Sequence, residues 1–204
     1  DDDLGSVRVI VENTTFTEAV SGGNAPAWTG TKIDKWVSLD KNSSAMTCIK
    51  DAIESSGFSQ QGADDGYISE IAGLAAFDGG SMSGWMGTLN DWFTNEGLTA
   101  YTVANGKLAS GDEIRMQYTM DWGADLGSDW SGTDTSLKAI SSDYGTLSPE
   151  FSAKTYNYTL TVPFGTKSIN FRPIALNKNF KTVSKIGDKT LSLTKPTEIK
   201  DGDI

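Results

Sequence analysis

The chain of 204 residues contains no histidine and a single cysteine, Cys48. Without histidine it lacks the commonest general base and the commonest transition-metal ligand, and the Ser-His-Asp and Cys-His catalytic arrangements are impossible. One cysteine excludes an internal disulfide and any site built from several cysteines. No run approaches the roughly 20 apolar residues needed to cross a membrane, so membrane insertion is not expected. The composition still permits a catalytic pair of carboxylates of the glycosidase type, but no motif identifies two particular acids as such a pair. We therefore expect a protein that is not an enzyme.

Charge is unevenly distributed along the chain. Through Asp134 there are 7 Lys/Arg and 21 Asp/Glu, a net charge of −14, whereas from Thr135 onward there are 10 and 6, a net charge of +4. A shift of this size indicates a domain boundary near residue 135. The acidic first part should repel nucleic acid and anionic membranes, so no nucleic-acid partner is expected.

The first part combines one helix with several strands. Ser43 or Ser44 can cap a helix that ends at Gly57, and Cys48 is expected on it as a buried, inert thiol. Strands are predicted at 7–11, 35–39, 67–71, 84–90, 101–103 and 113–120. Apolar side chains alternate along the last of these, which indicates a half-buried antiparallel strand. Without a β-α-β rhythm, the pattern predicts an α+β domain.

From residue 136 the pattern is that of short strands separated by turns. Strands are predicted at 137–140, 156–162, 169–171, 183–186 and 191–193, and no helix signal is present. This pattern predicts an all-β, sandwich-like domain.

Two stretches could carry binding. In Gly84–Met86, adjacent large side chains must point to opposite faces of a strand, so either both faces are covered or one aromatic is displayed to a flat ligand. In the loop after residue 120, Asp121, Asp125 and Asp129 alternate with glycines, and they are a possible calcium site; their spacing differs from the helix–loop–helix calcium loop, and a solvated interdomain loop is the alternative.

The first part resembles a known family. Gly84–Met86 followed by Leu89-Asn90, the capped helix before them, and Gly111–Ile114 leading into a strand resemble the transcobalamin-like C-terminal domain family over residues 5–131. The resemblance implies a β-grasp-like sheet carrying one helix. Vertebrate members close over cobalamin, whereas bacterial members occur in secreted or wall-attached proteins.

If ligand binding carries over from that family, a specific set of residues would perform it. Trp85 and Met86 would contact a flat ring system, Asn90 would anchor amides, and Trp92 would form an outer wall. The full set implied is Gly84, Trp85, Met86, Thr88, Asn90 and Trp92. Gly87 stands where the family commonly has an aromatic residue, and the absence of histidine excludes an imidazole ligand to cobalt.

The second part resembles another family. Leu137–Ile140, Gly145–Phe151 and Tyr156–Val162 are similar to the cadherin-like β-sandwich repeat of bacterial surface proteins, over residues 136–204. Such repeats act as spacers or adhesive modules. The last two strands of the repeat have no counterpart here, so we expect either a truncated domain or strands supplied by a neighbour.

Three functions follow as hypotheses. The first is an extracellular module of a Gram-positive cell-surface protein, secreted or attached to the cell wall, that binds a host or cell-surface protein or glycan. The second is binding of a soluble ligand, cobalamin or another corrinoid first, with no cofactor certain. The third is carbohydrate binding. A ligand site predicts Trp85 exposed in a groove, a sugar site predicts two coplanar exposed aromatics, and a spacer predicts every tryptophan buried.

Overall fold

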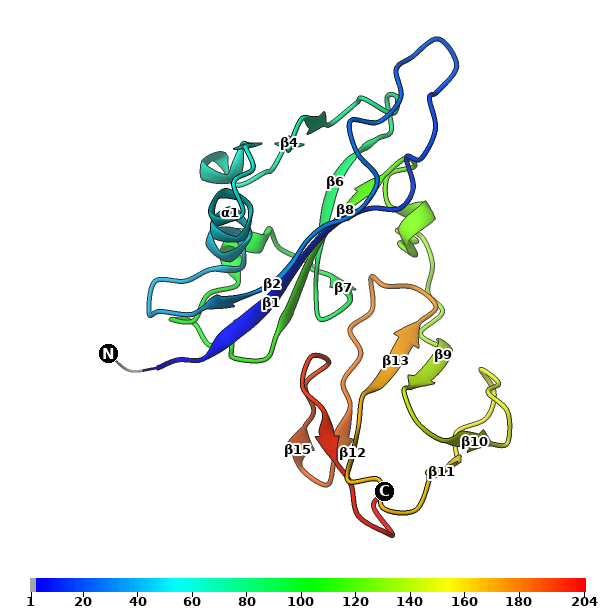
Figure 1. Cartoon of the computed structure of the whole chain (residues 1–204). Helices are drawn as coiled ribbons and strands as arrows, with labels where there is room; N and C mark the ends of the chain where they lie inside the picture. Colours follow the sequence, from blue (N-terminus) through cyan, green and yellow to red (C-terminus); the bar gives the residue numbers. More distant parts are fainter. Residues whose placement is uncertain (1–2) are drawn as a thin grey trace.

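A five-stranded sheet organises the first part of the computed structural model, which describes residues 3–204 (Figure 1). Its strands, in spatial order, are β2 (Gly30–Ser38), β1 (Ser6–Asn13), β8 (Glu113–Thr119), β6 (Gly84–Leu89) and β7 (Trp92–Phe93). The central pair β1 and β8 is parallel, and every other neighbouring pair is antiparallel. The chain therefore places its first and last strands of this part side by side.

Shorter elements connect these strands. They are β3 (Gln60–Gln61), β4 (Glu70–Ile71) and β5 (Leu74–Ala75), which form a small antiparallel sheet, and three 3-10 turns, η1 (Ala63–Asp65), η2 (Leu98–Ala100) and η3 (Ala124–Leu126). No helix in residues 3–204 has the length and apolar character needed to span a membrane.

The predicted helix is confirmed as α1 (Ala45–Ser55), which covers one face of the sheet (Figure 1). Ser44 caps it reciprocally with Thr47: the Thr47 N–H donates to Ser44 Oγ at 3.0 Å, and the Ser44 N–H donates to Thr47 Oγ1 at 2.8 Å. Gly57 follows at φ 82°, and the Phe58 N–H donates to the Ile53 carbonyl, which closes the helix as expected. Cys48 lies on this helix and is buried, as predicted.

The core lies between α1 and the sheet. Residues of α1 such as Ile49 and Ile53 are fully buried against Val9 and Ile114. Spacing of apolar residues by three and four along a helix produces this buried stripe. Trp85, near the start of β6, belongs to the same core.

Three predictions for the first part need correction. Residues 101–103 are not a strand, because Tyr101 ends η2 and Thr102 forms only an isolated bridge to Ser44. The strand predicted at 67–71 is reduced to β4. Strand β8 is not half-buried: Gln117 and Thr119 on its second face are 6% and 3% exposed, since other segments of the chain cover that face as well.

The second part consists of short strands that pair in twos. They are β9 (Leu137–Ser142) with β13 (Phe171–Ala175), β10 (Thr146–Ser148) with β11 (Thr159–Thr161), β12 (Ser168–Ile169) with β16 (Thr197–Glu198), and β14 (Lys185–Ile186) with β15 (Lys189–Thr190). Only Ile169 and Ala175 are buried apolar residues here. The molecule is thus β-rich with one helix, and the sandwich-like arrangement and the boundary at 131–136 stay predictions.

Candidate functional site

Trp85 is a core residue. It is 2% exposed, its Nε1–H donates to the Leu74 carbonyl at 2.9 Å, and its ring stacks on Trp28 and meets Tyr118 edge-on. A flat ligand therefore cannot reach its ring faces in this conformation, and the display in a groove that the ligand hypothesis requires is not found.

The other residues of the predicted ligand set do not converge on one cavity. Met86 and Thr88 lie on the opposite face of β6 from Trp85, and Thr88 is fully buried beside Gln117. The Trp92 indole N–H donates to the Asn179 carbonyl at 3.1 Å, so this ring packs against the second part. Gly84, at the start of β6, is buried.

Asn90 has a structural task at the turn between β6 and β7. Its side-chain amide donates to Asp112 at 3.0 Å and its side-chain oxygen accepts from the Glu113 N–H at 2.9 Å. Both polar groups of Asn90 are thereby used to fix the start of β8, and neither is directed to a ligand.

The three aspartates of the predicted calcium site have separate surroundings. Asp125 accepts hydrogen bonds from Thr119 Oγ1 and the Met120 N–H, and Asp129 accepts from the Ser131 and Gly132 N–H groups. Within residues 3–204, no group of three or more potential ligands is placed to hold a metal ion. Two of the three carboxylates thus stabilise turns.

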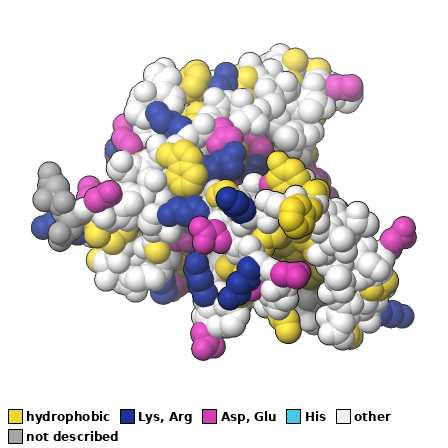
Figure 2. All heavy atoms as spheres, turned by 60° about the horizontal axis from the view of Figure 1, so that its bottom comes forward, with side chains coloured by type: hydrophobic (Ala, Val, Ile, Leu, Met, Phe, Trp, Pro, Cys, Tyr) yellow, Lys and Arg dark blue, Asp and Glu magenta, His cyan; other side chains and the backbone are white. Residues whose placement is uncertain are grey.

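A cluster of alternating charges joins the two parts. Arg172 of β13 makes a bidentate pair with Glu113 of β8, with nitrogen–oxygen distances of 2.8 and 2.9 Å. Lys178 Nζ lies 2.9 Å from Asp91, and Arg115 lies 2.9 Å from Glu12. Apart from the buried Glu113, these residues line an open groove of about 340 Å³. On the face in Figure 2, basic and acidic side chains are interspersed near the centre rather than separated by sign.

Burial sets the electrostatics of this cluster. Loss of water would raise the pKa of Glu113, which is 1% exposed, but hydrogen bonds and charge from Arg172, with help from Arg115, lower it below its ordinary value. The same pair raises the pKa of Arg172. Every acid of the groove has a cationic neighbour, so the cluster is suited to holding the two parts together.

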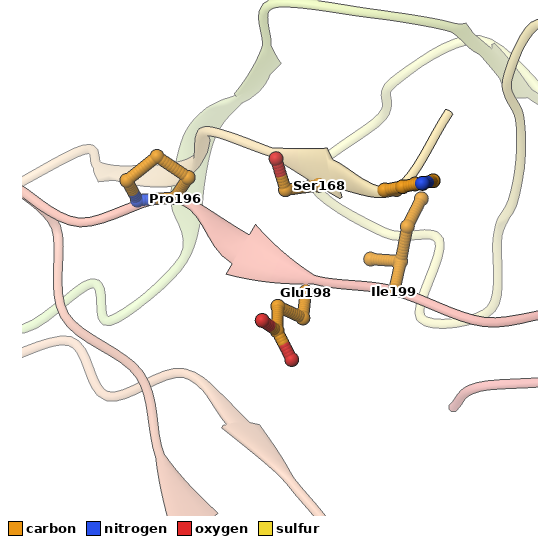
Figure 3. A pocket seen from close by; sticks show the side chains of 5 residues that line it. Ser168, Pro196, Glu198 and Ile199 are labelled. Atoms are coloured by element: carbon orange, nitrogen blue, oxygen red, sulfur yellow. The ribbon is translucent and has the colours of Figure 1, made fainter. Parts of the chain in front are cut away.

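A second hollow, of about 490 Å³, lies on the paired strands β12 and β16. Its labelled side chains, among them Ser168 and Glu198, do not converge on a common point (Figure 3). It offers no arrangement of groups for chemistry.

The feature most suited to binding is an exposed apolar surface at the end of the sheet where β8 ends and β6 begins. We call it the aromatic surface; it comprises Tyr67, Phe77, Met82, Trp122 and Trp130, which are 54%, 68%, 47%, 62% and 71% exposed. Among the large exposed apolar side chains of residues 3–134, only Trp36 lies elsewhere. The Trp122 N–H donates to the Met82 carbonyl at 3.0 Å and the Trp130 indole N–H donates to the Trp122 carbonyl at 3.3 Å, so the two loops are held together.

Two aromatics of this surface have strained backbones. Phe77 has φ 69° and Trp122 has φ 50°, in the left-handed region that costs an L-residue about 1–2 kcal/mol. Neither side chain recovers this cost through burial. Strain of this kind is concentrated at functional positions.

Sequence reasoning identified the loop after residue 120 as a possible calcium site but did not connect it with Phe77 and Met82. Pairing of β6 with β8 brings the two segments together, because Gly84 lies opposite Thr119.

Comparison with known protein families gives a match to part of the chain. No curated protein matches the chain. Residues 42–120, which include α1, β6 and β8, match a family described as a domain of unknown function (DUF4430), a transcobalamin-like family.

Proposed function

We propose that residues 5–131 form a β-grasp-like, non-enzymatic module with which a bacterial secreted or wall-attached protein binds another protein. The order of the sheet, its parallel central pair and the single helix covering one face support the β-grasp-like description. Residues 136–204 would serve as a cadherin-like, sandwich-type spacer, held to the module by the charge cluster.

The observation that carries this function is the aromatic surface. Protein-binding sites are enriched in Trp, Tyr, Phe and Met, and large apolar patches that stay exposed mark interaction sites. The strained backbones of Phe77 and Trp122 favour the same interpretation. An aromatic residue with no role in binding would be expected either to lack this strain or to be buried.

Carbohydrate is the second candidate, and a specific observation favours it. Trp122 and Trp130 are both exposed and are connected by a hydrogen bond, and exposed indoles can stack on sugar rings. Corrinoid binding has less support, because Trp85 and Trp92 are occupied by contacts within the chain.

Selection from a displayed random-peptide library tests the protein-binding function. The intact chain serves as bait, and the Trp122→Ala variant serves as counter-bait. Trp36→Ala is the matched control, since Trp36 is also exposed, at 46%, but lies on β2. We expect peptides that bind the wild type and Trp36→Ala at least about tenfold more tightly than Trp122→Ala, the loss typical of a central interface residue.

Glycans and cobalamin are tested with the same three proteins. Glycan binding that is lost only in Trp122→Ala would identify carbohydrate, rather than protein, as the ligand of this surface. If no peptide is enriched, protein binding through this surface is refuted.

A further inference from the structure

The chain segments that carry the residues of the aromatic surface contain no cation. No Lys or Arg occurs in residues 9–31, 51–106 or 116–137. These segments meet at one end of the sheet, where Thr15 Oγ1 donates to the Tyr118 carbonyl and the Trp122 N–H donates to the Met82 carbonyl. Neighbouring segments carry three lysines, whose ammonium groups contact other residues: Lys178 contacts Asp91, Lys181 lies over the Trp92 ring, and Lys32 lies over the Trp28 and Phe58 rings.

Carboxylates are present at the same end. Asp78, Asp121, Asp125 and Asp129 are all exposed. Asp121 precedes Trp122, and its carboxylate makes no hydrogen bond or salt bridge with any residue from 3 to 204. An indole with an unpaired carboxylate beside it is therefore available to solvent.

We infer that the partner bound by the aromatic surface is a basic protein segment whose Lys and Arg side chains lie across the exposed rings. This inference rests on the proposed function and specifies its partner. Aliphatic stems of Lys and Arg pack on aromatic faces, and their charged heads interact favourably with the rings and with nearby carboxylates. The net charge of −14 through Asp134 attracts such a segment over longer range and repels acidic competitors.

The test uses peptides selected as described above. Their Lys and Arg content is compared with that of the unselected library, and affinities for the intact chain are measured by calorimetry at low and high NaCl. Asp121→Asn is compared with Asp188→Asn, a matched change at an exposed aspartate in the second part. We expect enrichment of Lys and Arg, weaker binding at high salt, and a loss of about twofold to fivefold for Asp121→Asn alone, the range of an exposed ion pair.

Two results would overturn this inference while leaving the proposed function in place. One is selection of peptides that depend on Trp122 but show no Lys or Arg enrichment and no salt dependence. The other is equal affinity of Asp121→Asn, Asp188→Asn and wild type. Binding of basic peptides that is unaffected by Trp122→Ala would show general attraction to an acidic protein and would overturn both. Circular dichroism and unfolding midpoints verify that each variant is folded.

Discussion

Replacement of Arg172 by methionine should destabilise the first part by leaving Glu113 buried without its main partner. The Glu113 carboxylate is 1% exposed and accepts two hydrogen bonds from Arg172, while Arg115 contributes only a longer contact of 3.4 Å. Removing one partner of a buried ion pair lowers the free energy of unfolding by about 3–5 kcal/mol. Arg172 is 26% exposed and Arg115 remains, so we expect a loss of about 2–3 kcal/mol at pH 7.

The cost of this substitution should depend on pH. In the wild type the pKa of Glu113 is lowered, so the stabilisation is present above its ordinary value of 4.5 and is lost as pH falls through the folded-state pKa. In Arg172→Met, burial is no longer opposed by Arg172, and the pKa of Glu113 should rise instead. The variant is then penalised most at neutral pH, and the difference in unfolding free energy should shrink as pH falls from 7 to 4.

Urea denaturation followed by tryptophan fluorescence measures this difference, because all six tryptophans precede residue 135. Arg8→Met is the matched control: Arg8 also pairs with a carboxylate across the sheet, Asp34 at 2.7 Å, but both side chains are more than a third exposed. We expect it to cost less than about 1 kcal/mol. Equal costs for the two variants, or a cost of Arg172→Met that is constant from pH 4 to 7, would refute the reasoning.

Three further predictions concern the first part. Trp85→Ala should lower the unfolding free energy by about 3–5 kcal/mol in urea titration, because the ring is core, and an unchanged midpoint would contradict this. Phe77→Gly should raise stability by about 1 kcal/mol in thermal unfolding, because glycine accepts φ 69° without strain; a lower melting temperature would show that the ring packs usefully. Burial, with Asp51 and Asp40 nearby, raises the pKa of Cys48 to about 11, so its thiol should not react with a disulfide reagent at pH 8 until urea unfolds the chain.

Elements with a complete local signal were predictable from the sequence. Helix α1 has its cap at Ser44, its apolar spacing and its closing glycine within fourteen consecutive residues, Ser44 to Gly57. Strand β8 alternates clearly, and both β6 and β8 end within a residue of the predicted limits. Residues 101–103 carry β-branched and aromatic side chains as well, but the turns at Asn105 and Gly106 hold them in a loop, where no neighbouring strand is available.

The second part was harder to predict because its strands have little core to pack on. Alternation along 156–162 predicts a strand of seven residues, whereas only Thr159–Thr161 are paired, and Tyr156 is 87% exposed. Alternation determines which side chains share a face, but pairing also needs a partner strand and a buried face.

The candidate site could not be predicted from local patterns, because it forms only when distant segments of the chain pair. Its residues come from three loops, before β4, after β5 and after β8, and only the antiparallel register of β6 with β8 brings Phe77 and Met82 to Trp122. No local pattern contains that register. The sequence does contain a signal that does not depend on register, namely the absence of Lys and Arg from the segments that carry the aromatic surface, 51–106 and 116–137. Because solvated surfaces normally mix both signs of charge, aromatic residues within long cation-free segments are the pattern from which such a surface could have been predicted.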